Sequence, residues 1–288
     1  MTSEVSPSVE LPPWRYRAAD HPNIVPVRAF QDNYIWLITL DHLEGKRQAV
    51  VVDPGDAVPV MQALASTGLP LAGILVTHHH ADHTGGIGDL KAAWPRAAVY
   101  GPRKCANALI EHRFDHGDTV SLEGFGLECR VIEVPGHTLD HNAYFFQHIG
   151  QDQRPVLFCG DTLFAGGCGR VFEGTPAMMF ESLARLAELP PQTLVYCAHE
   201  YTLANLRFAQ AAEPGSEATS ERLREAEALR ARDVETVPST LDMELETNPF
   251  LRTAAPSIVA SVARRPGADV HDEKAVFTAL RQWKNEFK

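Results

Sequence analysis

The run Thr77-His78-His79-His80-Ala81-Asp82-His83 constrains this chain more strongly than any other stretch of its sequence. It has the form His-x-His-x-Asp-His, and imidazole and carboxylate groups together suit zinc, iron(II) and manganese(II). The apolar segment 72–76 precedes the run and predicts a buried strand, and a glycine pair follows it. The fold must therefore place several potential metal ligands on a loop at a strand end, where α/β sheets position their functional groups.

An exposed polar loop is the structural alternative for this run. Its histidines would repel one another as cations, and burying them without partners would cost several kcal/mol. A shared metal ion removes both difficulties, so we interpret the run as a metal site.

Composition and charge argue against several classes of function. The formal net charge of −11 disfavours both a basic face for nucleic acid and adhesion to anionic membranes. No stretch approaches the ~18 apolar residues of a membrane-spanning helix. The first residues have neither the basic nor the apolar region of a secretory signal, and the five cysteines form no CxxC pair. We expect a monomeric cytoplasmic protein with neither a nucleic-acid nor a membrane partner.

Hydrophobic periodicity divides the chain into two parts. The first part mixes predicted strands, at 25–30, 34–40, 49–52, 72–76, 99–100, 118–134, 143–146, 156–159 and 193–197, with predicted helices at 58–66, 87–94, 106–112 and 178–189. Beyond residue 198 the strand pattern vanishes, and helices are predicted at 201–212, 220–232 and 272–287. We therefore predict a flexible leader over 1–21, a mixed α/β domain over 22–198 and a helical domain over 199–288.

More potential ligands follow later strands of the first part. They are His137 in a Gly-His-Thr motif, Asp161 in a Gly-Asp-Thr motif, and His199, each directly after an apolar strand. Each motif alone is weak, because such tripeptides are common and an acid at a strand end often caps the next turn. With His78, His80, Asp82 and His83 they give seven ligands, too many for one tetrahedral zinc. The set fits two metal ions that share a carboxylate and a water.

This combination of motifs resembles the metallo-β-lactamase superfamily, and most fully its hydroxyacylglutathione hydrolases, also called glyoxalase II. The resemblance covers residues 22–288 and rests on the stretches 30–36, 77–86, 136–141, 160–164, 167–170, 172–175, 199–202, 248–252 and 281–284. It implies an α/β fold in which an αββα sandwich is followed by a C-terminal all-helical domain that binds substrate.

The resemblance also implies which residues hold metal. One ion takes His78, His80 and His137, a second takes Asp82, His83 and His199, and Asp161 bridges the two. Zinc is the expected metal, with iron and manganese as alternatives. His79 is not implied as a ligand, whereas His141 and Asp53 are candidates for orienting a ligand from behind. For Asp53, capping of the next helix is an equal alternative.

The implied reaction is hydrolysis of S-(2-hydroxyacyl)glutathione thioesters, in which S-D-lactoylglutathione gives glutathione and D-lactate, the second step of methylglyoxal detoxification. A hydroxide activated by the two metal ions, with Asp82 and Asp161 as catalytic residues, would attack the thioester carbonyl. The substrate is anionic, so positive charge must gather locally on this acidic protein. The residues implied to bind substrate are Arg170, Phe172, Tyr201, Arg281 and Lys284, while Cys168 is interpreted as a packing residue.

Two positions depart from the family pattern. Phe172 stands where some relatives have a tyrosine, so the hydroxyl that would hydrogen-bond the glutathione peptide is missing. Asp140 replaces a small residue, and it either adds an acid near the metals or faces solvent.

Other functions on the same fold stay open as alternatives. The main one is a glutathione persulfide dioxygenase with a single iron, although those relatives generally lack so long a helical domain. A zinc β-lactamase usually has cysteine where Asp161 stands, and a nuclease would want a basic arm that we do not find. A non-catalytic binding protein would be expected to lose ligands, whereas this chain keeps all seven.

Overall fold

The computed structural model describes residues 21–41, 45–122 and 125–287. The leader predicted over 1–21 therefore lies outside the described residues, apart from His21. That residue is buried, and its ring meets the edge of the Tyr196 ring.

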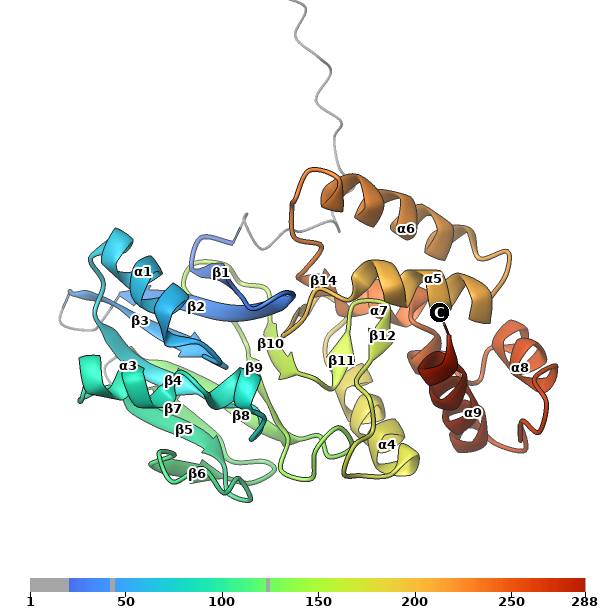
Figure 1. Cartoon of the computed structure of the whole chain (residues 1–288), viewed down its shortest axis with the longest axis horizontal. Coiled ribbons are helices and arrows are strands. Elements are labelled where there is room, and N and C mark those ends of the chain that lie inside the picture. The colour runs from blue at the N-terminus through green and yellow to red at the C-terminus, as the bar shows by residue number, and fades with distance from the viewer. Residues whose placement is uncertain (1–20, 42–44, 123–124, 288) are drawn as a thin grey trace, which may run out of the picture.

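Two six-stranded sheets form the first part of the molecule (Figure 1). The first sheet runs in chain order through β1 (Ile24–Ala29), β2 (Asn33–Asp41), β3 (Arg47–Val52), β4 (Leu71–Leu75), β5 (Ala98–Pro102) and β6 (His112–Phe114). Its strands are antiparallel from β1 to β3 and parallel from β3 to β6. The second sheet has the order β14 (Ser239–Thr240), β13 (Leu194–Cys197), β10 (Val156–Gly160), β9 (Asn142–Phe146), β8 (Leu127–Glu133) and β7 (Thr119–Leu122).

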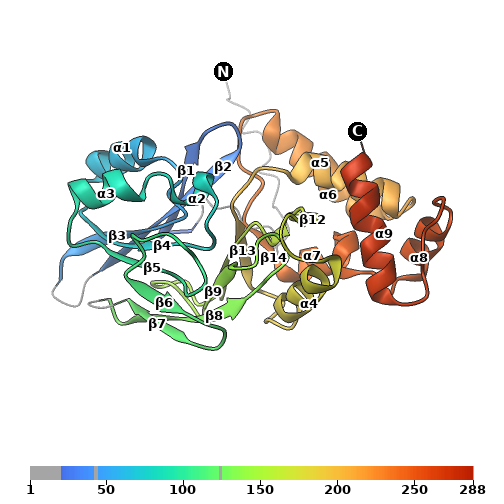
Figure 2. The same ribbon diagram turned by 60° about the horizontal axis from the view of Figure 1, so that its bottom comes forward.

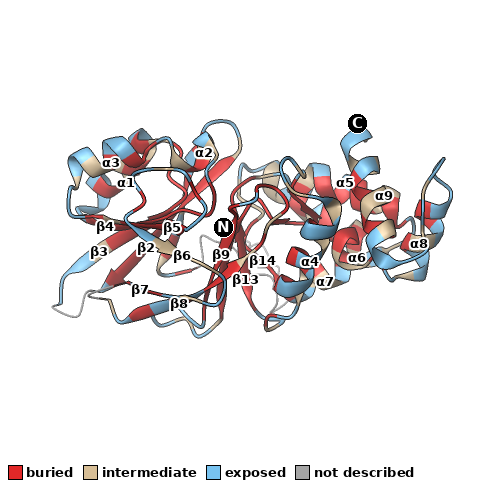
Figure 3. Cartoon of the chain, turned by 90° about the horizontal axis from the view of Figure 1, so that it is seen from below, coloured by how far each residue is buried: buried red, intermediate tan, exposed pale blue. Residues whose placement is uncertain are grey.

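Alternation along β2 shows how the layers pack. Trp36 and Ile38 belong to the core shared with the second sheet, whereas Ile35 and Leu37 belong to a separate core under α1 (Ala57–Thr67) and α3 (Ile87–Ala93). Because both faces of β2 are covered, its residues are buried without a polar side, as Figure 3 shows for the central strands. With α4 (Pro176–Ala187) packed beyond the second sheet, the result is the expected αββα sandwich.

Helices dominate the chain after β13, as expected. They are α5 (Thr202–Ala212), α6 (Glu217–Arg230), α7 (Leu241–Thr247), the 3₁₀ helix η2 (Pro249–Leu251), α8 (Pro256–Ala263) and α9 (Glu273–Glu286), and Figure 2 shows them beside the second sheet. One difference from the prediction is β14, which lies in this part and pairs with β13. A strand of two residues is too short to give an alternating pattern. The domain division at residue 198 stays a prediction.

The predicted helix over 106–112 is wrong, because this segment is a turn that leads into β6. The Arg113 guanidinium donates to the carbonyl oxygens of Cys105 and Asn107, and the Asn107 side chain accepts from the Leu109 amide. These side-chain bonds satisfy the backbone groups that a helix would have used.

Four strands direct the predicted ligands to one place. In the second sheet β8, β10 and β13 run in the same direction, and the ligand-bearing loops follow the carboxyl ends of these strands and of β4 in the first sheet. The first loop continues into the short helix α2 (Ala81–Thr84). No helix in the described part of the chain is both long and apolar enough to cross a membrane.

Candidate metal centre

All seven predicted ligands converge at this edge of the sandwich. They form three overlapping groups, each with its ligand atoms within 4.8 Å of one another: His78, His80 and His137; His78, His83 and Asp161; and Asp82, His83 and His199. The first and third groups are the two ligand sets implied by the resemblance, and the second joins them.

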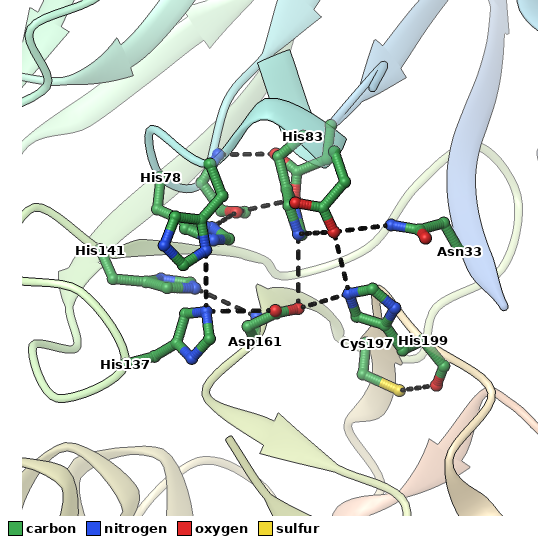
Figure 4. A network of polar contacts seen from close by, with 12 residues as sticks. Asn33, His78, His83, His137, His141, Asp161, Cys197 and His199 are labelled. Carbon is green, nitrogen blue, oxygen red and sulfur yellow. Dashed lines mark hydrogen bonds and ion pairs between the residues drawn. The ribbon is translucent and has the colours of Figure 1, made fainter. Parts of the chain in front are cut away.

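Asp161 lies between the two sets, with one oxygen toward each (Figure 4). Its Oδ2 is 3.3 Å from Nε2 of His137, while its Oδ1 is 3.3 Å from Nε2 of His199 and 3.5 Å from Nε2 of His83. This is the geometry that a carboxylate bridging two metal ions requires.

Unpaired ligand atoms show that the residues fit metal ions. Nε2 of His78, Nε2 of His83 and Oδ1 of Asp161 are buried and make no hydrogen bond within the described part of the chain, although the last two are in ion-pair contact at 3.5 Å. A buried polar atom left unpaired costs about 1–3 kcal/mol. Bound divalent ions would satisfy all three atoms at once, and the histidine and carboxylate donors suit zinc, iron or manganese.

For most of these groups, the pKa shift favours the protonation state that binds metal. Burial holds the pKa of His78 well below its usual value, so the ring is neutral. Burial opposes ionisation of Asp161, but the charges of His83 and His199 outweigh it and hold the pKa of Asp161 well below its usual value. For His83, burial is outweighed by Asp161 and Asp53, which raise its pKa, so metal binding there must release a proton.

Asp53 holds the back of the His83 ring. Its Oδ2 is 2.9 Å from Nδ1 of His83 and accepts from the Thr77 hydroxyl, and its Oδ1 accepts from the Thr77 amide at 2.7 Å. The helix that follows is capped instead by Asp56, whose carboxylate accepts from the Val58 amide. Asp53 is therefore placed to orient the His83 ring, and it is not the cap of the helix.

His141 acts on the backbone of the bridging residue. Its Nε2 accepts from the Asp161 amide at 3.1 Å, and its ring stacks on His78 with centroids 4.6 Å apart. Burial, together with the nearby His137, lowers the pKa of His141 to about 3, which keeps the ring neutral and able to accept. The prediction had placed it behind a ligand side chain.

Two further residues at the centre lie between the strands predicted at 25–30 and 34–40, and no role in the site was predicted for them. The carboxylate of Asp32 is 2.8 Å from Nδ1 of His199, and the Asn33 side chain donates to Asp82 at 3.1 Å. Sheet topology could have indicated these two residues. β2 is antiparallel to β3, so it begins at the edge of the sheet where β3 ends. A turn at that edge faces the ligands.

Asp140, one of the two departures, faces the protein and not solvent. It is buried, accepts from the Thr138 hydroxyl at 2.7 Å, and lies 3.0 Å from Nδ1 of His79. Nε2 of the same histidine is 3.3 Å from Glu173, whose other oxygen accepts from the Leu139 amide. His79 thus contacts two carboxylates and links three loops around the centre.

The predicted ligands border a cavity of about 530 Å³. The five residues predicted to bind substrate, Arg170, Phe172, Tyr201, Arg281 and Lys284, all line this cavity together with His80, Asp82, His137, Asp161 and His199. Phe172 is 62% exposed with its ring centroid 5.2 Å from that of His137, and Tyr201 stacks on His199 at 4.8 Å. Aromatic rings therefore flank the centre on both sides.

Positive charge also lines the cavity. Arg281 is buried and donates to the carbonyl oxygens of Cys168 and Gly169, while Lys284 donates to Ala204 at 2.8 Å. Burial, with the nearby charge of Arg281, lowers the pKa of Lys284 to about 8. Within the described ranges, neither these two cations nor Arg170 forms a salt bridge with a carboxylate. Their charges are not neutralised by the protein.

Solved structures show the fold. ETHE1 from Myxococcus xanthus covers 88% of this chain and 90% of its own with a TM-score of 0.57 and 23% identity. A di-iron-bound form of the protein TTHA1623 covers 79% of this chain and 100% of its own, with a TM-score of 0.50 and 27% identity.

Sequence comparisons agree with this geometry and extend to the whole chain. A family model described as metallo-beta-lactamase superfamily matches residues 30–199, and one described as hydroxyacylglutathione hydrolase C-terminus matches residues 200–287. The hydroxyacylglutathione hydrolase of Albidiferax ferrireducens is 49% identical over 266 residues, which is 92% of this chain and 99% of that protein. This chain belongs to the metallo-beta-lactamase superfamily and, within it, to the hydroxyacylglutathione hydrolases.

Proposed function

We propose that this protein is a thioester hydrolase that converts S-(2-hydroxyacyl)glutathione, with S-D-lactoylglutathione as the main substrate, to glutathione and the free hydroxy acid. The observation that carries the proposal is the cavity itself. It is lined both by residues that could hold two metal ions and by cations that form no salt bridge within the described residues. The names of the relatives support the same reaction, the second step of methylglyoxal detoxification.

The proposed cofactors are two divalent metal ions, with zinc expected and iron or manganese as alternatives. His78, His80 and His137 would hold one ion, Asp82, His83 and His199 the other, and Asp161 both. When bound, the ions supply a water of lowered pKa and polarise the carbonyl oxygen of the thioester.

Asp82 and Asp161 are the proposed catalytic residues of the chain. Asp161 fixes the spacing of the two ligand sets through its two oxygens. Asp82 borders the cavity, where its ionised carboxylate can accept a hydrogen bond from a water molecule and orient it. Burial disfavours its ionised form, but His83 and the Asn33 amide outweigh burial and lower the pKa of Asp82.

Substrate would lie along the cavity with its sulfur toward the metal ligands. The carboxylates of the glutathione peptide would meet Arg170, Arg281 and Lys284, and the apolar part would lie between Phe172 and Tyr201. The leaving thiolate has a parent pKa of about 8.5, so it needs less protonation than an amide nitrogen would.

The cellular setting is proposed from weaker observations. All five cysteines are free and buried, which suits a reducing compartment such as the cytoplasm. A monomeric state, the absence of nucleic-acid and membrane partners, and a substrate-binding domain over 199–288 stay predictions.

Release of thiol from S-D-lactoylglutathione tests the function directly. Metal-replete protein should release glutathione and D-lactate in equal amounts, and removal of metal by a chelator should stop the release reversibly. The absence of release from metal-replete protein would overturn the proposal. Oxygen consumption with glutathione persulfide would instead support the dioxygenase alternative.

A further inference from the structure

A small hairpin contributes Phe164 and Cys168 to the lining of the cavity. It consists of β11 (Leu163–Phe164) and β12 (Gly167–Cys168), which among the described strands pair with each other and not with either main sheet. Asp161 lies just before the hairpin, and the carbonyl oxygens of Cys168 and Gly169 at its other end accept from Arg281. Movement of the hairpin would therefore displace both the bridging carboxylate and a cation of the substrate end.

The helical part of the chain holds this hairpin by its backbone. The Gly166 amide donates to the Glu244 carboxylate at 2.8 Å, and the Asn248 side chain donates to the Gly167 carbonyl oxygen at 2.9 Å. The Asn205 side chain donates to the carbonyl oxygen of Ala165 at 3.2 Å. A buried loop this short cannot satisfy its own backbone groups, so these contacts decide where it lies.

Glu244 is the centre of this arrangement. Its side chain is fully buried, one oxygen forms an ion pair with Arg222, and the other accepts from both Gly166 and Asn248. All of these partners are donors, so both carboxylate oxygens are used. A buried ion pair adds little net stability compared with apolar packing, whereas a fully hydrogen-bonded one fixes the positions of its partners.

We propose that Glu244 is a positioning residue for the reaction, acting through the 163–168 hairpin on Asp161 at one end and on Arg281 at the other. The inference rests on the proposed function for its kinetic consequences. Its structural part concerns the metal site and can be tested without activity. On this view the helices do more than supply side chains to the substrate, because they also set the geometry of the metal centre.

The test compares Glu244→Gln with Glu213→Gln. Glu213 is a matched control, since it is also buried in the helical part and its two oxygens accept from Arg252 and Ser257. It forms no hydrogen bond to the hairpin within the described residues. In either variant the new amide nitrogen must face a donor, so both should lose thermal stability, and Glu244→Gln should lose more because its ion pair is more deeply buried.

The two variants should differ in function. Glu244→Gln should lower kcat on the order of tenfold, because small displacements of reacting groups are costly. It should also raise KM and weaken metal retention against a chelator, while Glu213→Gln should match the unchanged protein in all three. Equal behaviour of the two variants in kcat, KM and metal retention would overturn the proposal.

A second variant and a second readout keep the test decisive. Asn248→Ala removes the bonds to the Phe164 and Gly167 carbonyl oxygens and leaves the Glu244–Arg222 pair in place, so it should shift the same quantities in the same direction. It therefore decides the matter if Glu244→Gln fails to fold. Metal retention is measured without substrate, so failure of the proposed hydrolysis leaves this part of the inference testable.

Discussion

The predicted ligands at the metal end of the cavity lie just after apolar strands or in the short helix α2 that follows β4, whereas the predicted substrate residues at the other end come from two loops and one helix, α9. The strands that place the ligands belong to two large sheets with buried cores. The substrate end depends on a few side chains, such as Arg281 and Lys284, whose bonds reach backbone carbonyl oxygens of other segments. The ends of sheet strands thus carry the predicted chemistry, and side chains held by contacts between separate segments carry the predicted recognition.

This contrast predicts that the largest losses come from the metal end. Asp161→Asn should lower kcat/KM by at least about 10³-fold, because the amide cannot bridge two cations as a carboxylate does. Metal stoichiometry should fall with activity, and circular dichroism should show an unchanged fold. Near-normal thiol release by this variant would remove Asp161 from the bridging role.

A smaller loss of activity is expected from changing a residue that contacts a predicted ligand but is not itself one. Asp53→Asn should lower activity and metal affinity about 10- to 100-fold, since it removes the negative charge behind His83. Asparagine tolerates the left-handed backbone of this residue, whose φ is 53°, so the effect reports on charge and not on strain. Titration with zinc against a chelator gives the affinity. Unchanged affinity would mean that Thr77, not His83, is the partner that matters.

The success of the sequence-based predictions also differs between local patterns and contacts between distant segments. Ligands such as His137 and Asp161 were found because a strand end is a local pattern, and the structure brings them together. Asp32 was missed because a turn carries no sign of what lies across the sheet edge. Glu244 was missed for the same reason, since its partners Gly166 and Arg222 are distant in sequence and follow no period.

The helix wrongly predicted over 106–112 teaches a related point. Its apolar spacing was compatible with a helix, but Arg113 lies just beyond it and donates to the carbonyl oxygen of Asn107 within it and to that of Cys105 just before it. Hydrophobic periodicity indicates which positions are buried. It does not show that a nearby side chain will hydrogen-bond the backbone groups that a helix would use.

At the substrate end, pH should change binding and not chemistry. Lys284 has a pKa lowered to about 8, so its charge is present below that value and is lost as the pH rises through it. KM for the anionic thioester should therefore rise several-fold between pH 7 and about 9, with a smaller change in kcat. Lys284→Arg keeps its charge throughout this range and should flatten the KM profile. An identical rise in that variant would assign the titration to another group.

The smallest expected effect is a gain at the position that departs from the family. Phe172 lies 62% exposed in the cavity, so a hydroxyl added by Phe172→Tyr can reach a bound peptide without disturbing the core. One net hydrogen bond contributes about 0.5–1 kcal/mol, which lowers KM roughly two- to fivefold. Phe172→Leu is the control for the ring, because it removes the aromatic face and adds no hydroxyl. If the tyrosine lowers KM at constant kcat, recognition can be tuned separately from the metal end; if it alters kcat instead, the ring beside His137 takes part in the chemistry and the two ends are not independent.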